Sequence, residues 1–207
     1  MPLALVVGWS GVTAGAATTL AQVVRVRREG TDGVNATTWA LFTLMSAFWL
    51  AYGISAGSPE VVAGTLLGLP PLVWLLSMLE GPERRRGLLR GAGAIFAAAW
   101  VPAALFGWNV GLLGLGVLMV ATRMPQLLEL VRVRHARGVS TASWLIGSAS
   151  VVLWLTYYVT SEMTAAAVSM ALALVANVTI VALAAYRHRT ARADAYAGHP
   201  CVSFAVA

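Results

Sequence analysis

Seven long apolar stretches, separated by short polar connections, make up most of this sequence. They cover residues 3–24, 37–56, 60–79, 88–107, 109–131, 142–160 and 164–186. A helix needs about 20 mostly apolar residues to cross the hydrocarbon core of a bilayer. Because each stretch is of about this length, the pattern predicts an all-α integral membrane protein with seven transmembrane helices.

The composition agrees with a chain that is surrounded by lipid. Of 207 residues, 59% are hydrophobic and 11% are charged, whereas a soluble domain carries about 25% charged residues. The net charge is +6, and no lysine contributes to it. The basic residues occur in short groups between apolar stretches, so we expect the lipid bilayer and no nucleic acid as a partner. The single cysteine, Cys201, allows no internal disulfide.

The arginines mark one side of the predicted helices. Thirteen of the 14 follow the first, third, fifth or seventh stretch, and the connections after the second, fourth and sixth stretches contain none. The positive-inside rule places arginine-rich connections in the cytoplasm. We therefore expect a multi-pass protein of the plasma (inner) membrane, with its N-terminus outside and its C-terminus inside. Since arginines follow the first stretch and none precedes it, this stretch is expected to be a retained helix rather than a signal peptide.

Two halves of the chain carry the same pattern. Residues 33–52 match residues 138–157 at a constant offset of 105, and residues 17–22 match residues 121–126 at an offset of 104. The predicted helices 1–3 therefore correspond to helices 5–7. Helix 4 is unmatched and restores the direction of the second copy, which makes the copies parallel repeats. The expected units are a first three-helix bundle (1–81), a linker helix (82–107), a second three-helix bundle (108–187) and a disordered cytoplasmic tail (188–207).

The repeated residues resemble the PQ-loop family, in particular its SWEET and SemiSWEET transporters. The second copy contains Pro125-Gln126, then Gly138-Val139-Ser140 with Trp144, and then the pattern Trp154-x-x-Tyr157. In the first copy, Ala21 stands in the place of the proline, before Gln22. Its other matching residues are Gly33-Val34-Asn35, Trp39, Trp49 and Tyr52.

The resemblance implies a passive uniporter that works by alternating access between the two bundles. In that family the proline of the pair, here Pro125, acts as a hinge. Gln126 follows it directly and is matched by Gln22 in the first copy. A proline removes a helix hydrogen bond and clashes with the preceding turn, so helix 5 is expected to bend more than helix 1. The alternative is a static kink. For the two glutamines, hydrogen bonds to neighbouring helices or to backbone explain their place better than contact with a substrate.

The resemblance also implies a substrate pocket. Trp49 and Trp154 stand where the family places side chains against a sugar ring, although packing or contact with lipid is the alternative. The further candidates for the pocket are Thr65, Ser169, Met170 and Asn177, and Tyr52 and Tyr157 are candidates for a gate or a structural role. The family carries an asparagine pair where this chain has Thr65 and Ser169-Met170. The resemblance makes a sugar the first expectation, and because this chain lacks those asparagines, an amino acid or a small carboxylate is the alternative.

Arg123 is the one arginine that departs from this one-sided pattern, and it lies inside the apolar stretch 109–131. It precedes Arg132 by nine residues, which is about 13 Å along a helix axis. A charge at that depth costs several kcal/mol unless it is paired or reaches water. Arg123 is predicted either to line a cavity and attract an anionic or strongly polar substrate, or to snorkel to the headgroups.

The remaining features argue against proton-coupled transport and against an enzymatic activity. No Asp or Glu occupies the middle of a stretch, and proton-coupled carriers use such residues as relays. We therefore expect facilitated diffusion of a small-molecule solute, no cofactor and no metal. An enzyme is not expected, because the chain has no phosphate-binding loop and no metal-ligand spacing. A non-transporting receptor or scaffold is the alternative function, and both a monomer and a homo-oligomer fit the sequence.

Overall fold

The computed structural model describes residues 2–79, 81–133 and 138–197, and every regular element within them is a helix. The predicted all-α class is therefore confirmed. In chain order the elements are α1 (Pro2–Glu29), α2 (Ala36–Ser55), α3 (Pro59–Met78), α4 (Pro82–Ile95), the π-helical segment η1 (Phe96–Trp100), α5 (Val101–Phe106), α6 (Trp108–Ala121), α7 (Met124–Arg132), α8 (Thr141–Thr160) and α9 (Thr164–Ala197).

Seven helical segments are long and apolar enough to cross a membrane, as the sequence predicted. The fourth joins α4, η1 and α5, and the fifth joins α6 and α7. The other five segments lie within α1, α2, α3, α8 and α9. Their length and composition support a multi-pass membrane protein.

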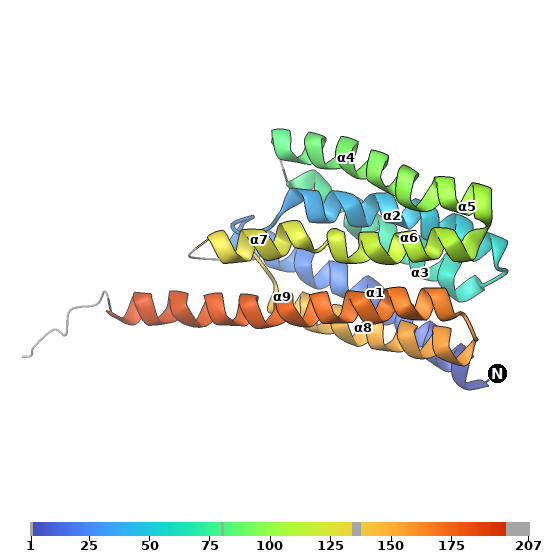
Figure 1. Ribbon diagram of the computed structural model, residues 1–207. Helices are drawn as coiled ribbons and strands as arrows, with labels where there is room; N and C mark the ends of the chain where they lie inside the picture. The colour runs from blue at the N-terminus through green and yellow to red at the C-terminus, as the bar shows by residue number, and fades with distance from the viewer. Residues whose placement is uncertain (1, 80, 134–137, 198–207) are drawn as a thin grey trace, which may run out of the picture.

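The spans lie roughly along one axis and successive spans run in opposite directions, so their connections gather at two ends (Figure 1). The N-terminus lies at one end, together with the α2–α3, α5–α6 and α8–α9 turns. The arginine-bearing connections lie at the other end, past which α9 projects. We call these the opposite end and the arginine-rich end. Within the bundle, α1 packs against α3 and α8, α9 packs against α8 and α6, and α2 packs against α3 and α4.

The repeated Gly-Val-Asn/Ser motif begins a helix in both copies. The side chain of Asn35 caps α2 by accepting from the N–H groups of Thr37 (2.9 Å) and Thr38 (3.2 Å). Ser140 caps α8 by accepting from the N–H of Ser143 at 3.0 Å. Such caps satisfy N–H groups that a helix leaves free at its start. The motif is therefore explained by helix capping before any function is considered.

The fifth span is broken where the proline predicts it. Helix α6 ends at Ala121 and α7 begins at Met124, and the N–H of Arg123 bonds to the carbonyl of Val120, three residues back, at 3.0 Å. By contrast, α1 continues without interruption through Ala21. Helix 5 is therefore interrupted where helix 1 is continuous, and α6 ends at Ala121, whose carbonyl would accept from the N–H that Pro125 lacks.

The expected disordered tail is wrong for residues 188–197. These residues continue α9, which ends at Ala197 and therefore extends eleven residues beyond the apolar stretch. The prediction stopped at Tyr186 because it followed hydrophobicity, whereas a helix can continue through polar residues once it has begun. Residues 198–207, including Cys201, lie outside the described residues.

The linker helix packs closely on α6 through glycines. A Cβ atom on Gly114 would lie 1.6 Å from the carbonyl oxygen of Ala98, and one on Gly111 would lie 2.6 Å from the Cβ of Ala103. The backbones of α6 and of the η1–α5 segment therefore touch directly. The unmatched fourth span is fixed to the second half of the chain at this contact.

We predict that Gly114→Ala destabilises the protein by about 1–3 kcal/mol or more, because an added methyl group must displace backbone. Thermal unfolding of the purified protein in detergent measures the effect. Gly93→Ala is the matched control, since nothing lies within 4 Å of a Cβ at Gly93 of α4. Equal melting temperatures for the two variants would contradict the direct backbone contact.

Candidate functional site

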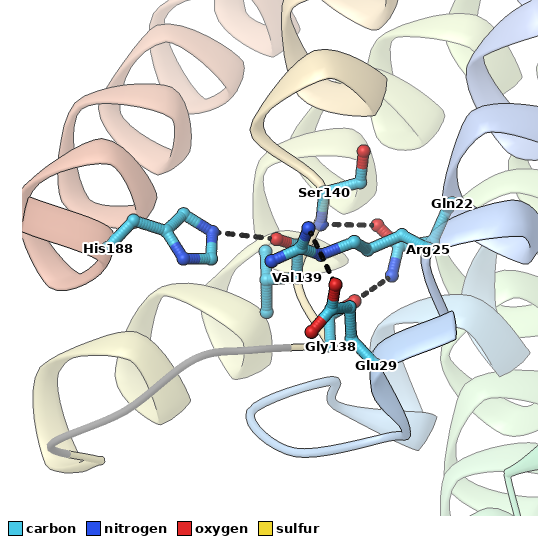
Figure 2. A network of polar contacts seen from close by, with 7 residues as sticks. All are labelled: Gln22, Arg25, Glu29, Gly138, Val139, Ser140 and His188. Carbon is cyan, nitrogen blue, oxygen red and sulfur yellow. Dashed lines mark hydrogen bonds and ion pairs between the residues drawn. The ribbon is translucent and has the colours of Figure 1, made fainter. Parts of the chain in front are cut away.

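A buried glutamine of α1 holds the loop that begins α8 (Figure 2). Gln22 is 1% exposed. Its Nε2 donates to the carbonyl of Gly138 at 2.8 Å, and its Oε1 accepts from the N–H of Ser140 at 3.0 Å. Both polar atoms of the side chain are thus used by backbone 116 and 118 residues away.

Gln126, the counterpart of Gln22 in the second copy, makes the corresponding contacts with the loop of the first copy. The Nε2 of Gln126 donates to the carbonyl of Gly33 at 2.7 Å, and its Oε1 accepts from the N–H of Asn35 at 3.0 Å. The glutamine of each copy therefore holds the helix-capping loop of the other copy. The expectation that these side chains bond backbone is confirmed.

The loop before α8 is held from a second side. Figure 2 shows His188 of α9 reaching the segment 138–140 across from Gln22. The His188 Nε2–H donates to the carbonyl of Val139 at 2.9 Å. Next to this segment, Arg25 and Glu29 form an ion pair at 3.5 Å within α1. The first turn of α8 is consequently fixed between α1 and α9 at the arginine-rich end.

At the opposite end, a tyrosine of each copy is hydrogen-bonded to a residue of the other copy. The hydroxyl of Tyr157 is hydrogen-bonded to the Oγ of Ser58 at 3.0 Å, and that of Tyr52 donates to the Sδ of Met163 at 3.7 Å. Ser58 and Met163 stand 105 residues apart, as do the two tyrosines. Ser58 also donates to a carboxylate oxygen of Glu60 at 3.3 Å.

A cavity lies among α1, α2, α3, α8 and α9, in two adjoining lobes of about 200 and 210 Å³. Glycines on three of these helices make room for it. A Cβ on Gly68 of α3 would meet no atom within 4 Å. Both lobes are lined by the following residues: Gly15, Thr19, Trp49 and Leu72. Volumes of this size suit a small solute.

The first lobe, which we call the tryptophan lobe, is lined on one side by three stacked rings. Tyr158 lies between Trp49 (ring centroids 6.0 Å apart, 15° between planes) and Trp154 (5.7 Å, 24°). All three side chains line the lobe, together with Thr65 and others. Offset stacking of this kind stabilises a rigid aromatic surface.

Tyr158 was missed by the sequence reasoning. It occupies the position that Gly53 has in the first copy, 105 residues earlier. The signal that could have identified it is this difference between the copies, a large aromatic residue in one and a glycine in the other. Its consequence is that a single tyrosine serves the tryptophans of both copies.

The second lobe, which we call the arginine lobe, contains Arg123 and a second group of rings. Trp39 and Trp144 stand at matched positions with ring centroids 6.1 Å apart. Both line the lobe beside Phe42. The guanidinium of Arg123 lies 5.1 Å from the centre of the Phe42 ring, within the range of a cation–π contact.

Arg123 is held inside the helix bundle. It is 4% exposed, its Nε donates to the Oδ1 of Asn177 at 2.5 Å, and its Nη1 donates to the carbonyl of Met119. The snorkelling alternative required the guanidinium to extend to the arginine-rich end. The contacts instead direct it across to α9, where Asn177 is itself 3% exposed.

The structure brings most of the predicted pocket residues together. Trp49, Trp154, Thr65 and Met170 line the tryptophan lobe, and Trp49, Arg123 and Asn177 line the arginine lobe. Ser169 is the exception. Its hydroxyl donates to the carbonyl of Leu112 at 3.0 Å and packs against Gly116 of α6. Position 169 faces α6 because it is one residue, or about 100° of helix, away from Met170.

A larger hollow of about 590 Å³ lies at the arginine-rich end, between the last turns of α1, residues 185–191 of α9 and the start of α8. Its lining includes Arg25, Glu29, His188 and Arg189. None of the predicted pocket residues belongs to it. Among the described residues, no group of three or more His, Cys, Asp or Glu side chains is arranged to hold a metal ion.

Comparison of the chain with protein-family models, with curated proteins and with solved structures found no match. The resemblance to the PQ-loop family therefore stays a prediction that rests on the repeated residues.

We predict that Gln22→Met and Gln126→Met each lower the stability of the protein. Each variant keeps the bulk of the side chain but leaves a buried carbonyl and a buried N–H without partners, at about 1–3 kcal/mol for each group. Thermal unfolding in detergent is the measurement. Ser77→Ala is the control, because the hydroxyl of Ser77 is exposed and bonds only within its own helix. A Gln22→Met protein as stable as this control would argue against the loop being held by the glutamine.

Proposed function

We propose that this chain is a passive membrane transporter that moves a small polar solute through the central cavity by alternating access. Its moving parts are two parallel three-helix units, α1–α3 and α6–α9, joined by the α4–α5 span. The single observation that supports this most is the position of the cavity. At each end of the cavity, equivalent residues of the two copies form hydrogen bonds to the other copy. These are the glutamines at the arginine-rich end and the tyrosines at the opposite end.

Reciprocal contacts of this kind are expected where two similar units face each other about a twofold axis. Substrate sites of repeat-built transporters lie at the repeat interface near the middle of the membrane. The lining residues come from both copies, since Trp49 and Thr65 belong to the first and Trp154 and Arg123 to the second. The PQ-loop resemblance leads to the same proposal.

The hydrogen bonds suggest how each end opens. To open the arginine-rich end, the bonds from Gln22 and Gln126 to the opposite loops must separate, and α7 can move about the break before Pro125. There the N–H of Gln126 bonds to the hydroxyl of Thr38 at 3.1 Å instead of to its own helix. To open the opposite end, Tyr52 and Tyr157 must leave Met163 and Ser58. We place the arginine-rich end in the cytoplasm of the inner membrane, following the positive-inside rule.

Passive movement is proposed because of the charges around the cavity. No Asp or Glu is among the described residues that line either lobe. A proton-coupled carrier needs a titratable relay within the membrane. Flux through this cavity is therefore driven by the gradient of the solute itself.

Counterflow into proteoliposomes tests the proposal. Vesicles loaded with an unlabelled sugar, amino acid or small carboxylate are diluted into the same labelled solute, and transient accumulation is expected for one class. A protonophore should leave this accumulation unchanged. Absence of counterflow for every class would favour the non-transporting receptor or scaffold.

We predict that Gly68→Leu abolishes this counterflow and leaves folding intact. Gly68 lines the tryptophan lobe, and a side chain there meets empty space, so the leucine fills the cavity at little cost in stability. Gly93→Leu is the matched control, because Gly93 is equally unobstructed but lies on α4, away from the cavity. Initial rates and melting temperatures are compared. Unimpaired counterflow in folded Gly68→Leu protein would place the solute path elsewhere.

A further inference from the structure

The arginine lobe has hydrogen-bond donors without partners. Arg123 carries five N–H bonds on three nitrogens. Its Nε and Nη1 are used by Asn177, by the carbonyl of Met119 and by the hydroxyl of Thr122 at 3.4 Å. Nη2 has no hydrogen-bond partner among the described residues. Its two N–H groups are therefore available to water or to a ligand.

Further donors lie in the same wall. Asn177 accepts from Arg123 through Oδ1, which leaves the Nδ2 group as a donor on the side of Gly147. The indole N–H groups of Trp39 and Trp144 are buried and have no partner in the described structure. All four residues line the arginine lobe. A buried donor without a partner is unfavourable, so the two unpartnered indole N–H groups in this wall require an explanation.

The charge of Arg123 is uncompensated as well. The ion pair that the described residues show is the one between Arg25 and Glu29 at the arginine-rich end, and no described carboxylate is paired with Arg123. A buried cation is stable only with a counter-charge or with water. The Phe42 ring and the Met119 carbonyl offset part of the cost through a ring quadrupole and a dipole, but neither supplies a negative charge.

The cluster belongs to one copy only. Arg123 corresponds to Thr19 in the first copy, and Asn177 corresponds to Leu72. Thr19 and Leu72 line both lobes, so the first copy supplies a hydroxyl and an apolar side chain where the second supplies a cation and an amide. A solute that fits is charged at one end and apolar or weakly polar at the other.

We propose that the arginine lobe binds the carboxylate of a small organic anion, with one carboxylate oxygen on the Nη2 of Arg123. This inference rests on the proposed function, because it names the class of solute that the cavity carries. The carboxylate supplies the missing negative charge and accepts hydrogen bonds from Arg123 and Asn177. The rest of the anion extends into the tryptophan lobe along the faces of Trp49 and Trp154.

Binding to the purified full-length protein tests the inference without requiring flux. The probes are lactate, succinate and benzoate, with lactamide, succinamide and benzamide as neutral analogues of the same shape. Saturable changes in tryptophan fluorescence are the readout, because Trp39, Trp49 and Trp144 line the lobe. At least one carboxylate is expected to bind at least tenfold more tightly than its amide, a difference of about 1.4 kcal/mol.

Variants test whether Arg123 is responsible. Arg123→Gln should weaken binding of that carboxylate at least tenfold and bring it close to the amide. Arg90→Gln is the matched control, since it removes the same charge from an exposed site on α4 and should bind as the unaltered protein does. Asn177→Leu, which copies the first repeat, should weaken binding without removing a charge. The comparison of carboxylate with amide needs no variant and remains decisive if Arg123→Gln does not fold.

The outcomes separate this inference from transport itself. Equal binding of carboxylates and amides, unaltered binding by folded Arg123→Gln, or no binding of any carboxylate overturns the inference. If a neutral solute nevertheless shows counterflow, the proposed transport stands without it. If carboxylates bind through Arg123 and no solute shows counterflow, the carboxylate site stands and the proposed transport falls.

Discussion

Each of the two buried glutamines uses both ends of its side-chain amide on backbone of the other half of the chain. Away from water, a backbone carbonyl or N–H must find its partner within the protein. The loops before α2 and α8 have such groups at Gly33, Asn35, Gly138 and Ser140, and Gln126 and Gln22 bond all four of them. The helices that begin at these loops, α2 and α8, supply nearly half of the residues that line the cavity. Their position therefore depends on two amides that lie 104 residues apart in the sequence.

The features that the sequence predicted are those that depend on local physics. Apolar length decides which segments can cross a bilayer, and Pro125 lacks the N–H that would continue the helix at its own position. The helix caps at Asn35 and Ser140 are equally local. The partners of Gln22 and Gln126 are different, because they come from segments more than 90 residues away. The repeat indicated that the glutamines are equivalent, but only the packed helices bring each to the loop of the other copy.

The same distinction explains the errors. Ser169 was assigned to the pocket because, with Met170, it stands where the family carries an asparagine, yet one residue of helix rotation directs it to α6. Tyr158 was overlooked because the reasoning looked for residues shared by the copies, whereas this tyrosine replaces a glycine. The rings of Trp49 and Trp154 reach a common partner only because the second copy carries it. Residues that the two copies share thus position the helices around the cavity, whereas residues that differ between the copies determine which side chains line it.

The break before Pro125 and the charge at Arg123 form one structural unit. The N–H of Arg123 bonds three residues back, to Val120, so the carbonyl of Met119 loses the partner that a continuous helix would supply. The guanidinium of the same residue donates to that carbonyl. In the first copy, Ala21 leaves α1 unbroken, and Thr19 stands in the place of the arginine. A helix that bends at this break changes the direction of its last turns, and the guanidinium that bonds there also lines the cavity. If the cavity carries an anion, the contact that binds the anion and the contact that supports the bend are made by the same side chain. Binding and bending are then coupled through Arg123, without any longer pathway between them.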